Sequence, residues 1–494
     1  MKYSFLLIIT SLILSCAGGK KYLNSRKISN AEHDIIKTKK EFWLTKSDQT
    51  ILLQEQKWDI ESPITNPNLP RISIDPKVTY QSIDGFGFNL TGGSSDLIYQ
   101  LPEKIQNDLL NELFAGPTQG GIRINYLRIT LGASDLSASI FSYNDLPSGQ
   151  ENDPDLKNFS LARDLETLIP VLKKIIKINP TLKILASPWS PPLWMKTNKN
   201  SIGGKLNPIY YPAYAKYFVK YIKAMREQGI IIDAITPQNE PLNEHNNPST
   251  SMSYQEQAEF IKNYLGPAFR NENIATKINI YDHNCDHVEY PMAILQDPKA
   301  AEFINGSAFH LYGTYERNFS IWGGDVSCLS KVKAAFPDKE VSLTEFWVGG
   351  PSQFSPVFMW HMKHMIIGGA KNWAKSVLEW NLAASSKFEP HTKGGCETCE
   401  GALSIDSDKI SRNVAYYIVA HASKFVDSGS IRIGSESSIE TLSHVAFKTT
   451  DNKNVLIVLN EKEATEEFAI EYQGKLKKAA LPAKSVGTFV WEEF

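Results

Sequence analysis

The sequence has no excess charge of either sign, because 52 Lys and Arg residues nearly balance 54 Asp and Glu residues and leave a formal net charge of −2. It also has no long basic run, so neither nucleic acid nor an anionic membrane surface is expected as a partner. It contains no internal repeat and no low-complexity tract. Apolar residues make up 42% of the 494 residues, which excludes a largely disordered chain and favours one large domain with a smaller one.

The apolar run at the amino terminus, about ten residues long, is too short to span a bilayer. Lys2 precedes it and small residues lead to Cys16, which is typical of a secretory signal peptide over residues 1–15. Cys16 resembles the cysteine of a bacterial lipobox, which becomes the lipidated first residue of the mature chain. We therefore expect an exported lipoprotein of a bacterial cell envelope, in the periplasm or on the outer-membrane surface, with residues 16–40 as a polar tether. The alternative is an ordinary signal peptide with an incidental cysteine.

Four cysteines remain besides Cys16, namely Cys285, Cys328, Cys396 and Cys399. In an exported protein the pair Cys396 and Cys399 favours a small disulfide-closed loop over a zinc site, which needs four clustered ligands. A thioredoxin-like redox site is a weaker alternative still, since no compact βαβ unit surrounds the pair. We expect no metal and no organic cofactor.

Strand-like and helix-like segments alternate through the middle of the sequence. Bursts of apolar, β-branched or aromatic residues lie at 83–88, 125–130, 182–186, 234–237, 278–281, 308–312, 341–344 and 376–380. Stretches with helical spacing lie between them, for example at 161–178, 211–228, 254–270 and 357–370. Eight such strands over about 300 residues predict an α/β fold, a (β/α)8 TIM barrel over residues 80–427. A doubly wound sheet is disfavoured, because Gly85-Phe86-Gly87 lacks the third glycine of a dinucleotide-binding turn.

Short β-prone segments lie on both sides of this region. At 428–494 they are separated by Asp-Asn and Gly turns, which predicts a β-sandwich at the carboxyl terminus. Residues 41–79 contain a few more such strands between Asp, Pro and Asn residues. We expect these early strands to pair into the sandwich and make the small domain discontinuous in sequence.

Carboxyl groups lie at the ends of two predicted strands, where a TIM barrel builds its function. Glu240 follows the fourth burst and Glu345 ends the seventh. Strands four and seven lie on opposite sides of a barrel mouth, so the two side chains can face each other. Cleavage of a glycosidic bond needs one protonated and one ionised carboxyl group, and a separation of about 5–5.5 Å gives retention of configuration. Repulsion raises the pKa of one of the two, which helps to assign the roles.

Tryptophans at two further strand ends favour a carbohydrate site. Trp189 follows the third burst, and Trp380 closes the eighth just before Asn381. Indole faces suit the apolar faces of sugar rings, whereas a buried tryptophan needs only packing and one partner for its N–H. A lone glutamate at a strand end is more often a salt-bridge or capping residue. Four such features at four strand ends are difficult to ascribe to packing alone.

These motifs resemble glycoside hydrolase family 30, the retaining β-glycosidases that include glucosylceramidases, β-1,6-glucanases and some xylan-cleaving enzymes. The resemblance covers nearly all of the mature chain from about Ile83 onward. The matching segments are 83–87, 127–129, 134–137, 186–189, 238–241, 310–312, 344–345, 380–382 and 421–425.

The resemblance implies a catalytic role for two glutamates. Glu240 would be the acid/base and Glu345 the nucleophile. Asn239 would donate a hydrogen bond to the 2-hydroxyl of the sugar. Tyr312 matches a tyrosine close to the nucleophile, and Arg128 is similar to an arginine beneath the site that helps to keep Glu345 ionised.

The resemblance also implies a glucose-binding set. Asp135, Trp189 and Trp380 match positions that hold the non-reducing glucose, and Asn381 belongs to the same motif as Trp380. His310 is expected to support the catalytic residues rather than to pack in the core.

The sequence departs from the family at two places. Thr91-Gly92-Gly93 replaces the Thr-Asp of many members, and residues 390–399 replace a Gly-Gly-Pro-Asn stretch of glucosylceramidases. We expect the 390–399 loop to shape the leaving-group side of the mouth. The predicted function is a retaining β-glycosidase for β-1,6-linked glucose in glucans. The alternatives are a glucosylceramidase or other β-glycosidase of the family and, in another class, a non-catalytic glycan-binding lipoprotein. Exo and endo action both stay open.

Overall fold

The computed structural model describes residues 40–60, 63–64, 66, 68–313 and 324–494. The predicted signal peptide, Cys16 and the predicted tether up to residue 39 lie outside the described residues. Within the described ranges, no helix combines the length and the hydrophobicity needed to cross a bilayer.

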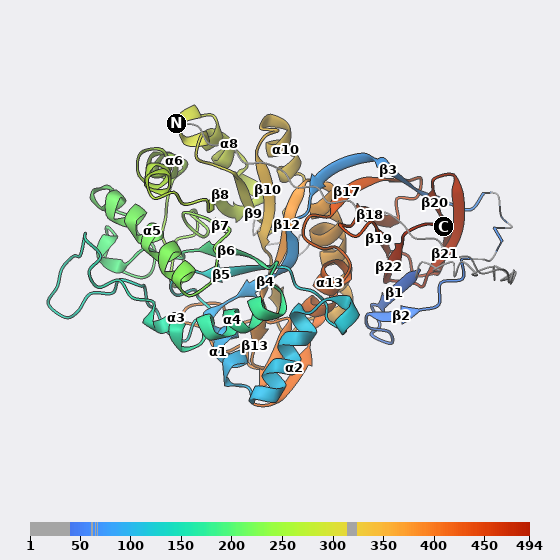
Figure 1. Cartoon of the computed structure of the whole chain (residues 1–494), viewed down its shortest axis with the longest axis horizontal. Coiled ribbons are helices and arrows are strands. Elements are labelled where there is room, and N and C mark those ends of the chain that lie inside the picture. The colour runs from blue at the N-terminus through green and yellow to red at the C-terminus, as the bar shows by residue number, and fades with distance from the viewer. Residues whose placement is uncertain (1–39, 61–62, 65, 67, 314–323) are drawn as a thin grey trace, which may run out of the picture. The chain divides into compact units, whose positions relative to one another are not determined.

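Eight parallel strands close into a barrel, as Figure 1 shows on the side away from the carboxyl terminus. In order around the barrel they are β4 (Gly85–Leu90), β5 (Tyr126–Thr130), β6 (Lys183–Ser187), β7 (Ala234–Ile235), β8 (Lys277–Asn284), β9 (Gly306–His310), β10 (Glu340–Glu345) and β12 (Ala374–Asn381). Every residue of β4, β5 and β9 is buried, because helices cover the outside of a parallel barrel. The predicted TIM barrel is confirmed, and each strand overlaps its predicted burst.

Helices form the outer layer. They are α1 (Gly92–Gln100), α2 (Glu103–Phe114), α3 (Ala162–Glu166), α4 (Leu168–Ile178), α5 (Tyr211–Glu227), α6 (Tyr254–Phe260), α7 (Gly266–Asn271), α8 (Glu289–Leu295), α9 (Pro298–Ala301), α10 (Cys328–Ala335), α11 (Phe354–His361), α12 (Gly369–Lys371) and α13 (Val414–Ser423). In α4 the buried residues Leu168, Val171, Leu172 and Ile175 follow helical spacing. The predicted helices over 254–270 and 357–370 each contain a π-helical turn, at Ile261–Leu265 and Met362–Gly368.

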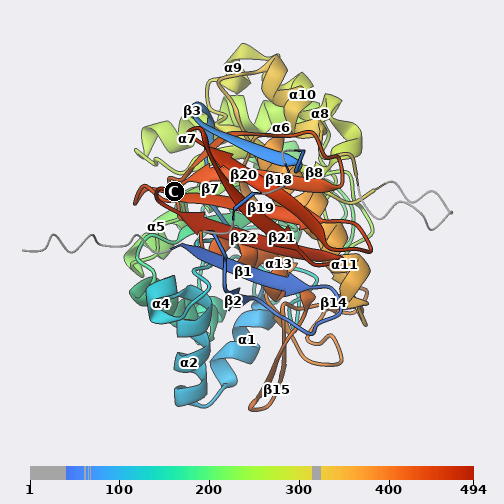
Figure 2. The same cartoon turned by 90° about the vertical axis from the view of Figure 1, so that its right-hand side faces the viewer.

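The second part of the fold is a nine-stranded sheet, which faces the viewer in Figure 2. Its order is β2 (Gln54–Gln56), β1 (Glu41–Lys46), β22 (Ser485–Trp491), β19 (Asn454–Asn460), β18 (Leu442–Lys448), β17 (Ile431–Ser437), β3 (Arg71–Ser82), β20 (Glu466–Tyr472) and β21 (Lys475–Leu481). β1 pairs with β22, and β3 lies between β17 and β20. The early strands therefore join the sandwich, as the sequence predicts.

The strands of this sheet divide their side chains between two cores. In β19, Val455, Ile457 and Leu459 pack into the core of the barrel, whereas Leu456 and Val458 pack into the core of the sandwich. This alternation follows from the two-residue period of a strand. One face of the sheet therefore covers barrel surface.

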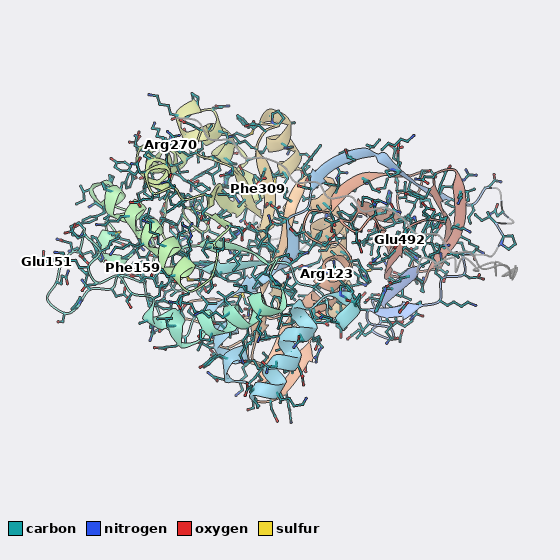
Figure 3. The ribbon with its side chains drawn as sticks, viewed as in Figure 1. Arg123, Glu151, Phe159, Arg270, Phe309 and Glu492 are labelled. Carbon is teal, nitrogen blue, oxygen red and sulfur yellow. A yellow bond between two sulfur atoms is a disulfide. The ribbon has the colours of Figure 1, made fainter. Side chains whose placement is uncertain are left out.

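Buried polar contacts also join the sandwich to α13. His421 Nδ1 lies 2.9 Å from Thr488 Oγ1 on β22, and its Nε2 lies 2.8 Å from Thr45 Oγ1 on β1. Figure 3 labels Arg123 at the junction of the two parts, between Phe309 on the barrel side and Glu492 on the sandwich side. The junction thus ties an early strand, a late strand and a barrel helix together.

Candidate active site

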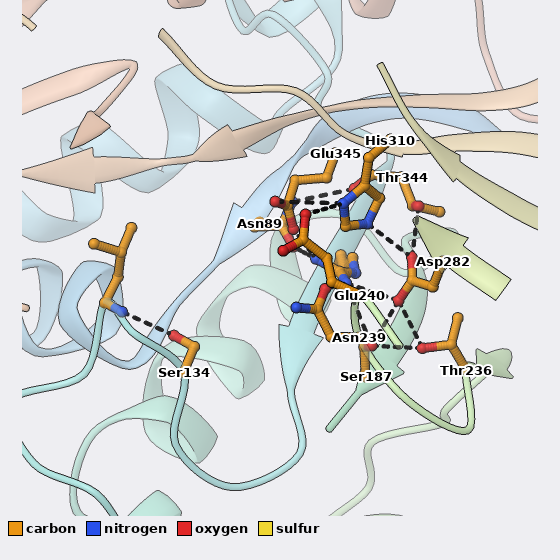
Figure 4. A network of polar contacts seen from close by, with 12 residues as sticks. Asn89, Ser134, Ser187, Thr236, Asn239, Glu240, Asp282, His310, Thr344 and Glu345 are labelled. Carbon is orange, nitrogen blue, oxygen red and sulfur yellow. Dashed lines mark hydrogen bonds and ion pairs between the residues drawn. The ribbon is translucent and has the colours of Figure 1, made fainter. Parts of the chain in front are cut away.

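Glu240 and Glu345 meet at the carboxyl-terminal mouth of the barrel, as Figure 4 shows from close by. Glu240 follows the short strand β7, and Glu345 is the last residue of β10. One oxygen of each carboxyl group and His310 Nδ1 all lie within 4.8 Å of one another. In glycosidases that retain configuration, two carboxyl groups lie close together on either side of the scissile bond. One protonates the leaving oxygen and the other attacks the anomeric carbon.

The backbone at Glu240 lies in the left-handed region, with φ of +45°. A residue other than glycine held there costs of order 1–3 kcal/mol, and such residues cluster at functional sites. Two backbone hydrogen bonds hold the segment in place. Glu240 N donates to Asp282 O at 2.9 Å, and Asn239 N donates to Pro188 O at 2.8 Å. These contacts to the neighbouring strand ends turn the carboxyl group into the mouth.

His310, the last residue of β9, lies between the two glutamates. Its Nδ1 is 3.0 Å from Glu240 Oε1 and 3.6 Å from Glu345 Oε1, and its Nε2 is 3.1 Å from Asp282 Oδ1. Burial by itself lowers the pKa of His310, but the carboxylates of Glu345, Asp282 and Glu240 outweigh it and raise the pKa to about 9. The imidazole is therefore cationic at neutral pH and in contact with the catalytic pair.

Arg128 on β5 lies beneath the site with its side chain fully buried. Its Nη1 donates to Glu345 Oε2 at 2.6 Å, and its Nη2 donates to Asp282 Oδ2 at 2.8 Å and to Asn239 Oδ1 at 2.6 Å. The contact to Asn239 occupies the amide oxygen, which leaves the NH2 group to donate elsewhere. Arg128 thus has the position that the resemblance implies for it.

The two glutamates differ in their electrostatics. Burial raises the pKa of Glu345, and the opposing effects of His310 and Arg128 do not fully offset it. Burial also raises the pKa of Glu240, but the hydrogen bond to His310 and the influence of His283 lower it to about 2. Repulsion from Glu240 is among the causes that raise the pKa of Glu345, whereas the pKa of Glu240 is lowered, so repulsion between the two glutamates does not identify Glu240 as the acid.

The group Glu240, His310 and Glu345 has the spacing of a set of metal ligands. Its surroundings disfavour a cation, however. Arg128 Nη1 already lies 2.6 Å from Glu345, and a protonated His310 has no free lone pair to bind a metal. The donor set therefore fits acid–base chemistry better than metal binding.

Asp282 is the residue that sequence reasoning missed. It lies near the end of β8 with its side chain fully buried. Its carboxylate accepts hydrogen bonds from Arg128, Ser187, Thr236, His310 and Thr344. Burial raises its pKa, but Arg128 and these hydrogen bonds hold it well below its ordinary value. A signal was present, since Asp282 follows the fifth burst as Glu240 follows the fourth.

Trp189 and Trp380 form one wall of the site. Their ring centroids lie 5.4 Å apart, and they are 2% and 3% exposed. Asp135 lies close to both glutamates, and its Oδ1 is buried without a hydrogen-bond partner among the described residues. Burial and the charges of Glu345 and Glu240 raise the pKa of Asp135 to about 7. A buried carboxyl oxygen with no hydrogen-bond partner among the described residues can accept a hydrogen bond from a sugar hydroxyl.

Tyr312 and Asn381 differ in what their side chains contact. Tyr312 Oη donates to Glu345 Oε1 at 2.9 Å. The side-chain oxygen of Asn381 instead accepts hydrogen bonds from Thr91 Oγ1 at 3.1 Å and Ser94 Oγ at 2.7 Å. Those bonds hold Asn381 against the start of α1, so its contact with substrate stays a prediction.

The loop over residues 390–399 packs behind the tryptophan wall. Cys396 and Cys399 form a disulfide, and Cys399 packs against Trp189 and Trp380. Thr392 N donates to Asp135 O at 2.8 Å. These contacts are to the predicted glucose-binding set, whereas Asn247 Nδ2, which follows Glu240 in the chain, donates to Lys393 O at 2.7 Å. The expectation that the loop shapes the leaving-group side therefore stays a prediction.

Two further features of the rim were not expected from the sequence. A Cβ at Gly93 would lie 2.6 Å from Pro390 Cγ, so the glycine at this position allows the 390–399 loop to approach closely. A second disulfide joins Cys285, just past β8, to Cys328 at the start of α10.

Comparison with protein families identifies both parts of the chain. The model of the glycosyl hydrolase family 30 TIM-barrel domain matches residues 83–426, and that of the family's beta sandwich domain matches residues 429–489. The chain belongs to glycosyl hydrolase family 30. It is therefore a glycoside hydrolase, and the resemblance stated from its motifs is confirmed.

Relatives of this family 30 protein cover most of its length. It is 33% identical over 415 residues to an endo-1,6-beta-D-glucanase of Neurospora crassa, over 81% of this chain and 83% of that protein. It is 27% identical over 435 residues to the lysosomal acid glucosylceramidase of Mus musculus, over 85% and 83% of the two chains. The solved structure of the endo-beta1,6-glucanase BT3312 matches it with a TM-score of 0.83 and 32% identity, over 92% of this chain and 100% of that one.

Proposed function

We propose that this family 30 hydrolase cleaves β-1,6-linked glucose in glucans by double displacement, with retention of configuration. The observation that carries the mechanism is the pair Glu240 and Glu345, with carboxyl oxygens within 4.8 Å of each other at the barrel mouth. The linkage is supported by similarity to relatives named as endo-1,6-β-glucanases, at 32–33% identity over most of both chains.

In the first step the Glu345 carboxylate attacks the anomeric carbon while the bond from that carbon to the leaving oxygen breaks. Arg128 and Tyr312 each hold one oxygen of Glu345 by a hydrogen bond, which orients the nucleophile. Glu240 first receives a proton from His310 Nδ1, which lies 3.0 Å from its Oε1, and passes it to the leaving oxygen, so that Glu240 is again a carboxylate when water enters. The Asn239 NH2 group donates to the 2-hydroxyl, a contact that strengthens in the oxocarbenium-like transition state.

In the second step water replaces the leaving group. Glu240 accepts a proton from the water as its oxygen attacks the anomeric carbon, and the bond to Glu345 breaks. The sugar leaves with the configuration it had, because two inversions restore it. The acid and base roles thus fall to one residue, Glu240, at two stages.

The test measures sugar release from a β-1,6-glucan and from glucosylceramide, with the anomer of the first product followed by proton NMR. We expect hydrolysis of the glucan, a β anomer as the first product, and no turnover by Glu345→Gln. Glu289→Gln is the matched control, because that carboxyl group is exposed and pairs with His287 rather than with either catalytic glutamate. Hydrolysis of the glucosphingolipid alone would refute the substrate, and turnover by Glu345→Gln would refute the nucleophile.

We also propose that the protein is an exported lipoprotein anchored through Cys16. The support is the sequence of residues 1–16 alone. Mass spectrometry of the amino-terminal peptide from a bacterial host should find a lipid on Cys16, and Cys16→Ser should release the enzyme from the membrane fraction. Unmodified Cys16 in a membrane-free enzyme would contradict the anchor.

A further inference from the structure

The end of β8 carries an irregularity that turns two consecutive side chains toward the site. The register with β9 shifts between Tyr281 and His283, and Tyr281 and Asp282 have φ of +75° and +58°. In a regular strand the side chains of Asp282 and His283 would lie on opposite faces. Here Asp282 contacts Arg128 inside the barrel, and the His283 ring lies parallel to His310 with centroids 6.3 Å apart. Bulges with strained residues occur beside active sites, where they redirect a side chain.

His283 has a hydrogen-bonding group that the described part of the protein leaves unmet. The residue is 7% exposed, and its Nδ1 is buried without a partner there. A buried polar atom without a partner costs about 1–3 kcal/mol, so such atoms in native proteins call for a ligand or a water. Burial lowers the pKa of His283, and the charge of Glu240, which raises it, does not fully offset this effect. The ring is therefore neutral at neutral pH and offers one donor and one acceptor, the pair that a hydroxyl can satisfy.

His283 lies on the Glu240 side of the catalytic pair. Glu240 is the strongest charged influence on it, and His283 in turn helps to lower the pKa of Glu240. Both oxygens of Glu240 already receive hydrogen bonds, from His310 and Asn243, so His283 is not needed to hold Glu240 in place. The group beside Glu240 during cleavage is the leaving group, since Glu240 protonates its oxygen in the proposed mechanism.

We propose that His283 hydrogen-bonds a hydroxyl of the leaving-group sugar and so favours substrates that release a sugar over those that release an alkyl chain or a lipid. The inference rests on the proposed function, in that it takes Glu240 as the acid. It does not rest on the β-1,6 linkage. His283 is then a specificity-determining residue on the far side of the scissile bond from the Trp189 and Trp380 wall.

The test compares leaving groups in two variants. His283→Phe keeps a ring of similar size and removes both nitrogens, and His283→Gln restores one hydrogen-bonding group. The substrates are the β-1,2-, β-1,3-, β-1,4- and β-1,6-linked glucobioses and 4-nitrophenyl β-glucoside, which has no leaving-group sugar. For the glucobiose that the wild type cleaves fastest, we expect His283→Phe to lower kcat/KM about tenfold, the value of one hydrogen bond. The nitrophenyl glucoside should stay within about twofold, and His283→Gln should recover part of the loss.

His287→Phe is the control, because that histidine lies nearby with half of its side chain exposed, and its kinetics should not change. Equal losses on both kinds of substrate, with a lower melting temperature, would overturn the inference and make His283 a packing residue. Unchanged cleavage of the glucobiose would overturn it as well. A wild type that prefers a linkage other than β-1,6 refutes the proposed linkage while the comparison still decides the role of His283. A wild type that cleaves no glucobiose refutes both.

Discussion

Replacing Asp282 by asparagine tests the electrostatics of the site directly. Asp282 and Arg128 both have fully buried side chains, with Nη2 and Oδ2 2.8 Å apart. Asp282 also lies 3.1 Å from Nε2 of His310. Asparagine has nearly the same shape but carries no charge, and its NH2 group cannot accept the hydrogen bonds that the lost oxygen received. Arg128 then keeps Glu345 as its only close carboxylate within the described residues.

The expected cost follows from burial. Removing one partner of a buried ion pair destabilises a protein by about 3–5 kcal/mol, because the other charge stays buried and uncompensated. The pKa of Asp282 is far below its ordinary value, so its stabilising effect is complete at neutral pH and is lost as the pH falls below about 4. The pKa of His310 is raised to about 9, so its effect is complete below about pH 6.5 and is lost as the pH rises through about 9.

Urea unfolding of Asp282→Asn and wild type, followed by tryptophan fluorescence at about pH 6 and again above pH 9, measures this cost. We expect a lower unfolding free energy by about 3–5 kcal/mol at the lower pH and a smaller difference at the higher pH, where His310 is neutral in both proteins. Asp286→Asn is the control, because Asp286 is exposed just past the same strand. A loss under about 1 kcal/mol near pH 6, or an equal loss at both pH values, would refute the reasoning.

Three further predictions concern pH, the wall and the rim. The value of kcat/KM should rise with pH as Glu345 ionises, at a pH above the ordinary pKa of a glutamate, and should fall as His310 loses its proton near pH 9. A fall of kcat/KM that begins below pH 7 would contradict this. Trp380→Ala should lower the unfolding free energy by about 3–5 kcal/mol because the ring is buried, whereas Trp380→Phe should keep most stability and raise KM. The double variant Cys396→Ser and Cys399→Ser should raise KM with little change in kcat, because Thr392 in the same loop donates a hydrogen bond to the backbone oxygen of Asp135. A fall in kcat alone would oppose that reading.

Much of the fold follows from local pattern. The eight barrel strands were predictable because each is a burst of apolar residues, such as Gly85–Leu90 and Gly306–His310, that parallel packing buries on both faces. The π-helical turns at Ile261–Leu265 and Met362–Gly368 were not, since the apolar spacing runs through them without a break. The disulfide between Cys285 and Cys328 was also missed, because the two residues approach only when β8 and α10 pack together.

The candidate site was predictable in part for the same reason. Glu240 and Glu345 stand out as carboxyl groups at strand ends, and their motifs match a family. Asp282 did not stand out, since a carboxyl group that joins Arg128 to His310 has no local pattern of its own. The contact of the 390–399 loop with Asp135 was not predictable, because it joins residues more than 250 positions apart in the sequence.

The order of residues by itself determined the barrel, the sandwich, the two glutamates and the family. Only the folded structure decided where the protons lie, because pKa values depend on burial and on distances of a few ångströms between residues from different strands. It brought a His310 with a raised pKa into contact with Glu240, left one buried oxygen of Asp135 without a hydrogen-bond partner among the described residues, and placed His283 directly after two residues with positive φ. Each of these depends on Coulomb and hydrogen-bond energies across the barrel mouth, which no local pattern of residues encodes.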